Sequence, residues 1–339
     1  MKKLTSLLLV FVLILAIFSS CAPKDVKDPV SEESVKPLKI GVLSGTTGMG
    51  SAKLVNDIKA GGEEISKYYE SIDIYTDPST LLSDFISEKV DVAALPTNAA
   101  STLFNKSKGN AKVVAINTLG VLYILDSSGE VKSLSDLSGK TVYVATPGQT
   151  PEYILKHILN ENNIENVNLS YDYTDLDSLT SAIATGAVEI ALLPEPKVTI
   201  AQVTAANNGI ANLAVAIDLT EEWNKVEDTV LTQGCVVVRK DIAENYNASL
   251  EKFLKDYEAS INYITDESNL DLAAEAIASS GIIPKAAIAK KALPKCNITF
   301  IAGEEMKAAL SSFLKVLYDM DKTAIGGNLP ADDFYYISE

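Results

Sequence analysis

Val-Asp-Val-Ala-Ala-Leu-Pro at 90–96 and Val-Glu-Ile-Ala-Leu-Leu-Pro at 188–194 are nearly the same stretch of sequence. Each follows a run with helical spacing, over 81–88 and 179–185, and each leads through a polar or acidic turn into another helix. A spacing of about a hundred residues is too long for a solenoid repeat. We therefore expect two α/β lobes of similar build, with the loops beyond their strand ends forming a shared ligand site.

Strand and helix patterns alternate along most of the chain and predict the α/β class, with two mostly parallel sheets flanked by helices. The strand candidates are 38–43, 72–75, 90–95, 112–116, 121–125, 141–145, 167–171, 188–193 and 235–239. Helices are expected over 51–68, 151–160 and 179–185, and then over 242–265, 270–279, 285–293 and 304–317. The length of 339 residues favours two domains. We place lobe 1 at 38–120 plus 233–339 and lobe 2 at 121–232, joined by two crossing segments that make a hinge.

The N-terminus indicates export. Lys2 and Lys3 precede an apolar run over 7–18, which is too short for a membrane span and typical of a signal peptide, here 1–20. Small residues before Cys21 resemble a bacterial lipobox, in which the cysteine is lipidated; an ordinary cleaved signal with an incidental cysteine is the alternative. The polar segment 21–37 is expected to be a lipid-anchored linker. The net charge of −16 argues against nucleic-acid binding.

Several further stretches carry a family resemblance. They are Gly-Val-Leu-Tyr at 120–123, Leu-Ser-Asp-Leu-Ser-Gly-Lys-Thr-Val-Tyr-Val at 134–144, Thr-Pro-Glu-Tyr at 150–153, Ala-Thr-Gly-Ala-Val-Glu-Ile-Ala-Leu-Leu-Pro-Glu-Pro at 184–196 and Thr-Gln-Gly-Cys at 232–235. With them the chain resembles the extracytoplasmic solute-binding lipoproteins of ABC importers, in the cluster for nitrate, sulfonates, taurine and thiamine precursors. The resemblance does not specify the ligand, because members with different substrates share these stretches.

The resemblance implies a two-lobed periplasmic-binding-protein fold of type II. It also implies a monomer, anchored by lipid outside the cytoplasm of a bacterium, which captures a small molecule and delivers it to an ABC permease and its ATPase. A receptor module that reports the ligand to a membrane sensor is an alternative. A third hypothesis is an enzyme, because some enzymes of menaquinone and tetrapyrrole synthesis share the fold.

Four helix starts are expected to meet in the cleft between the lobes, at 44–49, 96–98, 147–150 and 194–196. Each presents backbone N–H groups and the positive end of a helix dipole. The expected ligand-binding residues are Ser44, Gly45, Thr46, Thr47, Met49, Thr97, Asn98, Tyr123, Gln149, Thr150, Glu195 and Gln233. The Thr and Asn side chains also suit plain helix capping, and Gly45 also suits a tight turn.

The charged residues of the chain restrict the class of ligand only in part. Arg239, the single arginine, is expected just beyond a strand near the returning hinge segment, and none of the four loops contains arginine or lysine. Amino-acid carboxylates are usually held by a guanidinium, so they are disfavoured. Glu195 in the cleft would accept hydrogen bonds from a neutral or cationic heterocycle such as a thiamine-type pyrimidine. A sulfonate-like anion held by N–H groups, with Glu195 as a surface carboxylate, stays open.

No catalytic residue, metal site or cofactor is expected. The only histidine, His157, lies inside the predicted helix from 151, where we expect it to be a polar residue that is exposed or within capping distance of the helix end. One histidine without a Cys-x-x-Cys motif does not make a zinc site. Cys235 and Cys296 both fall in lobe 1; a disulfide between them and two separately buried thiols are both open.

Overall fold

The computed structural model describes residues 35–145, 147–210 and 212–338. The expected signal peptide, the lipidated Cys21 and most of the linker lie outside these residues, so those expectations stay predictions. Within the described ranges, no helix combines the length and the apolar character that crossing a membrane requires.

Two β-sheets, sheet A and sheet B, carry the fold. Sheet A has the strand order β11-β4-β10-β3-β1-β2, and sheet B has the order β7-β6-β8-β5-β9. The strands of sheet A are β1 (Leu38–Leu43), β2 (Tyr69–Tyr75), β3 (Val92–Pro96), β4 (Ala111–Leu119), β10 (Thr232–Arg239) and β11 (Ile298–Ile301). Those of sheet B are β5 (Leu122–Asp126), β6 (Thr141–Val144), β7 (Asn168–Ser170), β8 (Ile190–Pro194) and β9 (Ala214–Asp218). We call each sheet with its helices a lobe, lobe 1 for sheet A and lobe 2 for sheet B.

The α/β class is confirmed, but the expectation of mostly parallel sheets is wrong. In sheet A, β1 pairs in parallel with β2 and β3, whereas β10 pairs antiparallel with β3 and β4. In sheet B, β6 is parallel to β7 and β8, and β5 is antiparallel to β8 and β9. The antiparallel pairs arise because the chain crosses from one sheet to the other. β5 and β10, the first strands after the two crossings, run against the parallel strands of the sheet that they enter.

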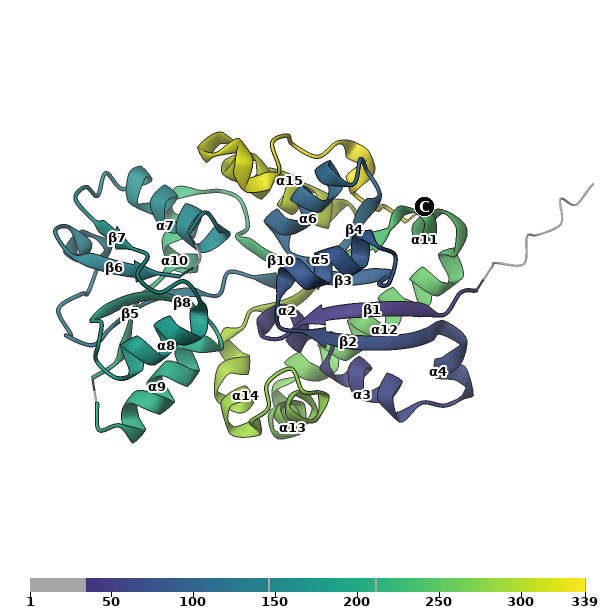
Figure 1. Ribbon diagram of the computed structural model, residues 1–339, viewed down its shortest axis with the longest axis horizontal. Helices are drawn as coiled ribbons and strands as arrows, with labels where there is room; N and C mark the ends of the chain where they lie inside the picture. Colours follow the sequence, from purple (N-terminus) through teal and green to yellow (C-terminus); the bar gives the residue numbers. More distant parts are fainter. Residues whose placement is uncertain (1–34, 146, 211, 339) are drawn as a thin grey trace, which may run out of the picture. The chain divides into compact units, whose positions relative to one another are not determined.

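The chain passes between the sheets twice (Figure 1). Gly120 and Val121 connect β4 to β5, and residues 227–231 lead from lobe 2 back to β10. The backbone N–H of Leu119 donates to the carbonyl of Asn297, and the side chain of Asn297 donates to the carbonyl of Gly120. Both connections are therefore short, and the first is held by a residue that is far away in sequence.

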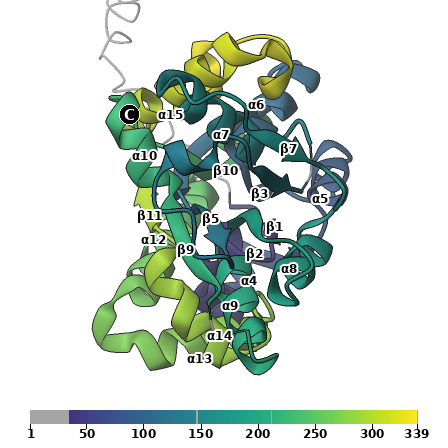
Figure 2. The ribbon, with the colours of Figure 1, turned by 90° about the vertical axis from the view of Figure 1, so that its left-hand side faces the viewer.

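Helices cover both faces of each sheet. The helices of lobe 1 are α2 (Thr46–Met49), α3 (Ala52–Ala60), α4 (Glu63–Tyr68), α5 (Pro78–Ile86), α6 (Thr97–Lys106), α11 (Lys240–Asn245), α12 (Asn247–Thr265), α13 (Leu270–Ser280), α14 (Ala286–Ala292) and α15 (Gly303–Met320). Those of lobe 2 are α7 (Thr150–Glu161), α8 (Leu176–Ala184), α9 (Lys197–Asn207) and α10 (Leu219–Val226). Figure 2 looks onto lobe 2, with α7 and α10 in the upper half and α8 and α9 in the lower half.

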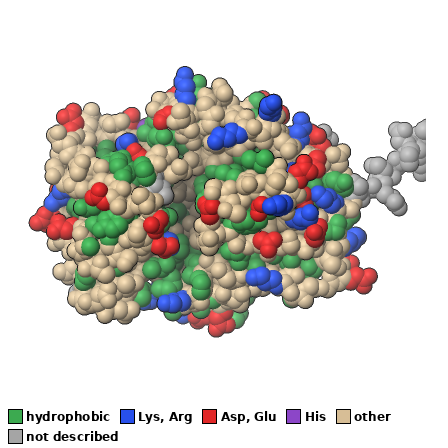
Figure 3. Space-filling model, in the orientation of Figure 1, with side chains coloured by type: hydrophobic (Ala, Val, Ile, Leu, Met, Phe, Trp, Pro, Cys, Tyr) green, Lys and Arg blue, Asp and Glu red, His purple; other side chains and the backbone are tan. Residues whose placement is uncertain are grey.

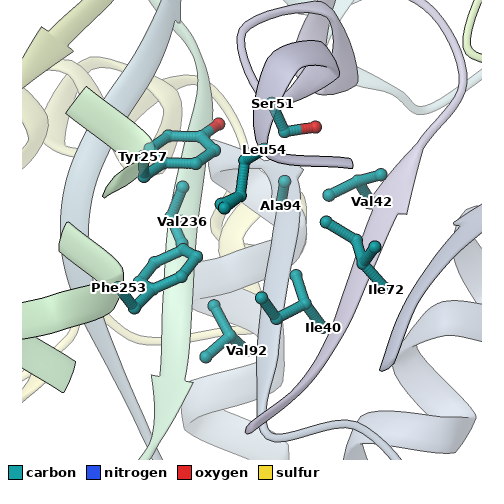
Figure 4. A pocket seen from close by; sticks show the side chains of 10 residues that line it. All are labelled: Ile40, Val42, Ser51, Leu54, Ile72, Val92, Ala94, Val236, Phe253 and Tyr257. Atoms are coloured by element: carbon teal, nitrogen blue, oxygen red, sulfur yellow. The ribbon is translucent and has the colours of Figure 1, made fainter. Parts of the chain in front are cut away.

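Burial on two faces explains why β3 is apolar at each position. On β3, Ala93 and Leu95 pack into the core shared with α5, α6 and α15, while Val92 and Ala94 pack into the core shared with α3 and α12. Alternate residues of a strand point to opposite faces, so a sheet covered on both sides needs apolar residues at each position. Figure 4 shows the second of these cores, where side chains from β1, β2, β3 and β10 meet Phe253 and Tyr257. The gap among them has no room for a water molecule.

Two strands and two helix breaks were not predicted. β9 carries exposed residues at its start, and β11 is only half-buried, so both lack the apolar pattern of the other strands. The expected helix over 51–68 is divided into α3 and α4 at Gly61 and Gly62, whose φ angles are +75° and +123°. Positive φ values suit glycine and end a right-handed helix. The expected helix over 242–265 is divided into α11 and α12 at Tyr246.

The two cysteines of lobe 1 are free and buried, which settles the alternatives in favour of separate thiols. Cys235 lies on β10, and Cys296 lies between the 3-10 turn η3 (Leu293–Lys295) and β11. The Cys296 thiol donates to the carbonyl of Ala292 at 3.2 Å. Burial raises the pKa of both thiols, so neither is a reactive thiolate near neutral pH.

We therefore expect both thiols to be protected in the folded protein. With Cys21 changed to Ser, Ellman's reagent should give no rapid reaction in native buffer and should titrate Cys235 and Cys296 completely in denaturant without a reductant. Incomplete titration in denaturant would show that the two thiols are bonded.

The core in Figure 4 predicts a strong effect of truncation. Phe253 is 1% exposed, and Phe253→Ala should lower the free energy of unfolding by about 3–5 kcal/mol in urea denaturation. Leu272→Ala is the control, because Leu272 is 56% exposed and should cost less than about 1 kcal/mol. Equal losses from the two variants would contradict this packing.

Candidate functional site

The four expected helix starts lie in two pairs, one in each lobe. β1 and β3 are parallel neighbours with Val42 opposite Ala94, so the residues after both strands lie at the same edge of sheet A. β6 and β8 are parallel neighbours with Val144 opposite Leu192, which places the starts of α7 and α9 at one edge of sheet B. Ligands of open α/β sheets bind at such carboxyl edges.

The two edges meet at α2 and the turn before α9. The hydroxyl of Thr46 donates to the backbone carbonyl of Glu195 at 3.3 Å, and a Cβ on Gly45 would lie 3.9 Å from the ring of Pro196. Figure 3 shows a groove between the two lobes. We take the walls of this groove as the candidate ligand site and call it the cleft.

The residues around α2 divide into those near the cleft and those in the core. Gly45 has a φ of +96° and precedes α2, and the exposed Ser44 donates its N–H to the carbonyl of Tyr75 at 2.8 Å. Thr47 is half-buried. Met49 is fully buried in the core of lobe 1, so we leave it out of the ligand-binding set. Because α2 has only four residues, its dipole is weak, and its contribution is through individual N–H and hydroxyl groups.

The start of α6 is tied to the hinge. Thr97 is fully buried, and its hydroxyl donates to the carbonyl of Thr232, the first residue of β10, at 2.9 Å. Asn98 is 7% exposed. The Thr97 hydroxyl therefore fixes α6 against β10, which brings the start of α6 beside Gln233.

Three buried polar atoms at the starts of α7 and β10 have no hydrogen-bond partner among the described residues. They are the hydroxyl oxygens of Thr150 and Thr232 and the side-chain nitrogen of Gln233. Thr150 begins α7, and Thr232 and Gln233 begin β10. Unpartnered buried polar groups cost free energy and are rare in native proteins, which indicates that a ligand or water satisfies them.

The loop before α7 is braced from within lobe 2. Glu152 accepts hydrogen bonds from the N–H of Gly148 at 2.6 Å and from the hydroxyl of Tyr171 at 2.8 Å, and it pairs with Lys156. Burial raises the pKa of Glu152, but these partners outweigh burial and hold the pKa below its usual value. Gln149, in the same loop, is exposed. A braced loop presents Thr150 in a fixed position.

Glu195 is buried at the junction of the lobes, with 1% of its surface exposed. Its carboxylate accepts hydrogen bonds from the N–H and the hydroxyl of Thr199 at 3.2 and 3.0 Å, and the ammonium of Lys295 lies 3.9 Å away. Desolvation raises the pKa of Glu195, opposed by Thr199 and by the charge of Lys295. Glu195 thus supports the first turn of α9 and also faces a cation from lobe 1.

Tyr123 lies in the core of lobe 2 and is 7% exposed. Its hydroxyl donates to the carbonyl of Lys295 at 3.2 Å, so the side chain joins lobe 2 to lobe 1. Burial raises its pKa.

Two sequence expectations outside the site are wrong. His157 is 9% exposed, its Nε2 lies 2.6 Å from a carboxylate oxygen of Glu227, and its ring is 5.3 Å from that of Trp223. It lies on the face of α7 that packs against α10, which the helix position alone did not indicate. Arg239 ends β10 at the opposite end of the strand from the hinge, where it pairs with Glu88 and Asp241.

Two residues of the site were missed. Lys295 follows a proline in a helical stretch and carries no recognisable signal. Asn117 is buried on β4, and its side-chain nitrogen donates to the carbonyl of Thr47 at 3.0 Å and to the hydroxyl of Tyr257 at 2.9 Å. The expected strand ended at 116, and β4 also contains Lys112 and Thr118, so the sequence pattern did not distinguish Asn117. In the described part of the chain, no three His, Cys, Asp or Glu side chains gather as a metal site would require.

Known proteins agree with this architecture. A protein-family model described as menaquinone biosynthesis matches residues 69–319. An ABC transporter structure from Parabacteroides distasonis shares 22% identity and has a TM-score of 0.74, over 89% of this chain and 99% of that chain. The periplasmic aliphatic sulphonate binding protein SsuA from Escherichia coli shares 15% identity and has a TM-score of 0.69, over 90% of this chain and 94% of that chain.

The periplasmic nitrate-binding protein NrtA from Synechocystis PCC 6803 shares 12% identity and has a TM-score of 0.57, over 90% of this chain and 92% of that chain. No curated protein matches the sequence. At these identities the likeness to the solved structures shows a common fold, and this confirms the expected type II periplasmic-binding-protein architecture.

The environment of Glu195 predicts a pH effect on stability. Because its pKa is raised in the folded state above the unfolded value of 4.5, the folded protein binds more protons, and stability falls as pH rises from 4.5 through the folded pKa. Gln at this position does not titrate. The stability of Glu195→Gln relative to the parent should therefore increase between about pH 4 and about pH 8 in thermal unfolding.

Glu258→Gln serves as the control, because Glu258 is an exposed residue of α12. Its stability relative to the parent should change little over the same range. A relative stability of Glu195→Gln that stays level or declines as pH rises would show that Glu195 is not a desolvated carboxylate.

Proposed function

The chain belongs to the menaquinone biosynthesis family, and we propose that this member is the solute-binding component of an ABC importer and not an enzyme. Its lobes, 38–120 plus 233–339 and 121–232, close on a small molecule in the cleft and open at a permease. The observation that supports the proposal is the set of buried polar atoms of Thr150, Thr232 and Gln233, which lack a hydrogen-bond partner among the described residues and belong to α7 in lobe 2 and to the start of β10 in lobe 1.

The polar groups of the cleft suit binding better than catalysis. Glu195 is held by Thr199, and its carboxylate lies 3.9 Å from the ammonium of Lys295, so both of its neighbours belong to the protein. The only histidine pairs with Glu227 between α7 and α10, and the only arginine is at the far end of β10. A general acid or base must reach the reacting proton, and these two side chains are engaged elsewhere.

The ligand is a small molecule rich in hydrogen-bonding groups. Hydroxyls and a carboxamide offer both donors and acceptors, and Glu195 adds an acceptor beside the cation Lys295. A thiamine-type pyrimidine or another neutral heterocycle fits these groups, and a sulfonate-like anion fits the donors alone. A micromolar dissociation constant corresponds to about −8 kcal/mol, which several neutral hydrogen bonds of about 1 kcal/mol each and burial of a ring supply.

Closure follows from the two connections between the lobes. A ligand that bonds to groups of both lobes binds the closed form more tightly than the open form and shifts the equilibrium toward it. The contact of Thr46 with Glu195 and that of Tyr123 with Lys295 join the two lobes.

The protein works, in this proposal, outside the cytoplasm as a monomer, attached to the bacterial membrane by lipid on Cys21. Its partners are the permease and the ATPase of the importer. The alternative is a sensor module, which binds the same ligand but reports it to a membrane sensor. Genes for a permease and an ATPase beside this gene would favour the importer.

A role as an enzyme of menaquinone biosynthesis is the second candidate, because the family model carries that description. The two functions differ in what happens to the ligand. Incubation of the protein with its ligand, followed by mass spectrometry, should return the ligand unchanged. Conversion of the ligand would favour the enzyme.

The test of binding begins with mass spectrometry of small molecules released from the purified full chain by denaturation. A thermal-shift screen of pyrimidines, alkanesulfonates, nitrate and flavins then provides ligands for calorimetry. Thr150→Val and Gln233→Leu should each weaken binding about tenfold, as expected for one lost hydrogen bond to a buried group, while melting temperatures change by only a few degrees.

Thr185→Val is the matched control, because Thr185 is exposed and its hydroxyl bonds within α8. Its affinity should equal that of the parent. If Thr150→Val and Gln233→Leu also retain the parent affinity, the cleft is assigned to the wrong residues.

A further inference from the structure

A second pocket, which we call the hinge pocket, lies beside the crossing segments. Its volume is about 400 Å³, and its walls come from the end of β4, from α10, from residues 227–231 and from Asn297. It shares no residue with the expected ligand-binding set, so it is separate from the cleft.

The walls of the hinge pocket are fixed by hydrogen bonds outside it. The indole N–H of Trp223 donates to the carbonyl of Thr229 at 2.7 Å, and His157 holds one carboxylate oxygen of Glu227 at 2.6 Å. Asn297 donates to the carbonyl of Gly120. A pocket held in this way is preformed, and a ligand pays little ordering cost to occupy it.

The charged side chains that line the hinge pocket are all acidic. Glu227 and Asp228 bring two carboxylates, and the lining contains no basic side chain. The carboxylate of Asp228 makes no ion pair or hydrogen bond with any described residue. Such an unpaired carboxylate next to a second one attracts a cation.

Two further observations point to an occupant. The hydroxyl oxygens of Thr220 and Thr229, both lining residues, are buried and lack a hydrogen-bond partner among the described residues. The lining also includes Leu119, Val230 and Leu231, of which Val230 is 42% exposed.

We propose that the hinge pocket binds a small organic cation, an alkylammonium ion with a short aliphatic body. The ammonium group donates to the carboxylates of Glu227 and Asp228, and the aliphatic part covers Leu119 and Leu231. A bare metal ion fits less well, because two carboxylates with apolar neighbours do not provide the six to eight oxygen ligands that calcium takes. This site is independent of the function proposed for the cleft.

The chain has a single tryptophan, and it reports on this site. Because Trp223 bonds to Thr229 in the pocket wall, its fluorescence and its indole N–H resonance should respond to an occupant. Titration of the full chain with n-butylammonium chloride, at constant ionic strength with potassium chloride, should give a saturable change of both signals. Matched concentrations of n-butanol and sodium butyrate should give no saturable change.

Asp228→Asn combined with Glu227→Gln should raise the dissociation constant of n-butylammonium at least about fivefold, because both charges are lost. Asp228→Asn alone should raise it measurably, and it keeps the test decisive if the double variant unfolds, since Asp228 is exposed. Glu258→Gln, an exposed carboxylate on α12, should bind like the parent. Absence of a saturable signal overturns the proposal, and so does an unchanged dissociation constant in Asp228→Asn.

Discussion

The antiparallel pairing of β4 with β10 is the constraint on which the remaining structure depends. Leu119 pairs with Thr232, so the strand that leaves lobe 1 and the strand that returns to it are neighbours in one sheet. Because both connections start from this pair, lobe 2 is attached through two adjacent strands. The pairing also brings Gln233, Thr97 and Asn117 to the edge of sheet A that faces lobe 2.

Close packing around this pair explains why small and polar residues occur there. A Cβ on Gly234 would lie 2.5 Å from the carboxamide oxygen of Asn117, and a Cβ on Gly120 would lie 2.2 Å from the hydroxyl of Thr220. Either addition would force backbone or side chains apart. The glycines thus permit the approach through which hydrogen bonds of Asn117 fix α2 relative to the central strands.

The molecule has polar groups of two kinds near the hinge. Asn117 is buried and fully engaged, so it adds order to the fold. The Thr150 hydroxyl and the side-chain nitrogen of Gln233 are buried and have no hydrogen-bond partner among the described residues, and such groups are tolerated where a function supplies the partner. The cleft and the hinge pocket lie on different residues of the same crossing, so a molecule bound at either place contacts segments that change direction when the lobes move.

The sequence alone was sufficient for the α/β class, for most strands of both sheets and for the doubled arrangement of lobes. The physical reason is local: a strand covered on both faces is apolar at each position, and a helix start carries turn and capping residues. The four segments expected at the cleft were predicted in the same way, because each directly follows such a strand. β9 and β11 have weak apolar patterns, and they were therefore missed.

Only the tertiary structure determined which polar side chains of the expected site are available to bind a ligand. Thr97 and Thr150 look equivalent as sequence, yet the first hydroxyl is bonded to Thr232 and the second is unpartnered. Met49 enters the core, and Lys295 reaches Glu195 from a segment a hundred residues away. The sequence also did not predict the relative direction of neighbouring strands or whether the two thiols are bonded. Both depend on contacts between residues distant along the chain, whose geometry no local pattern encodes.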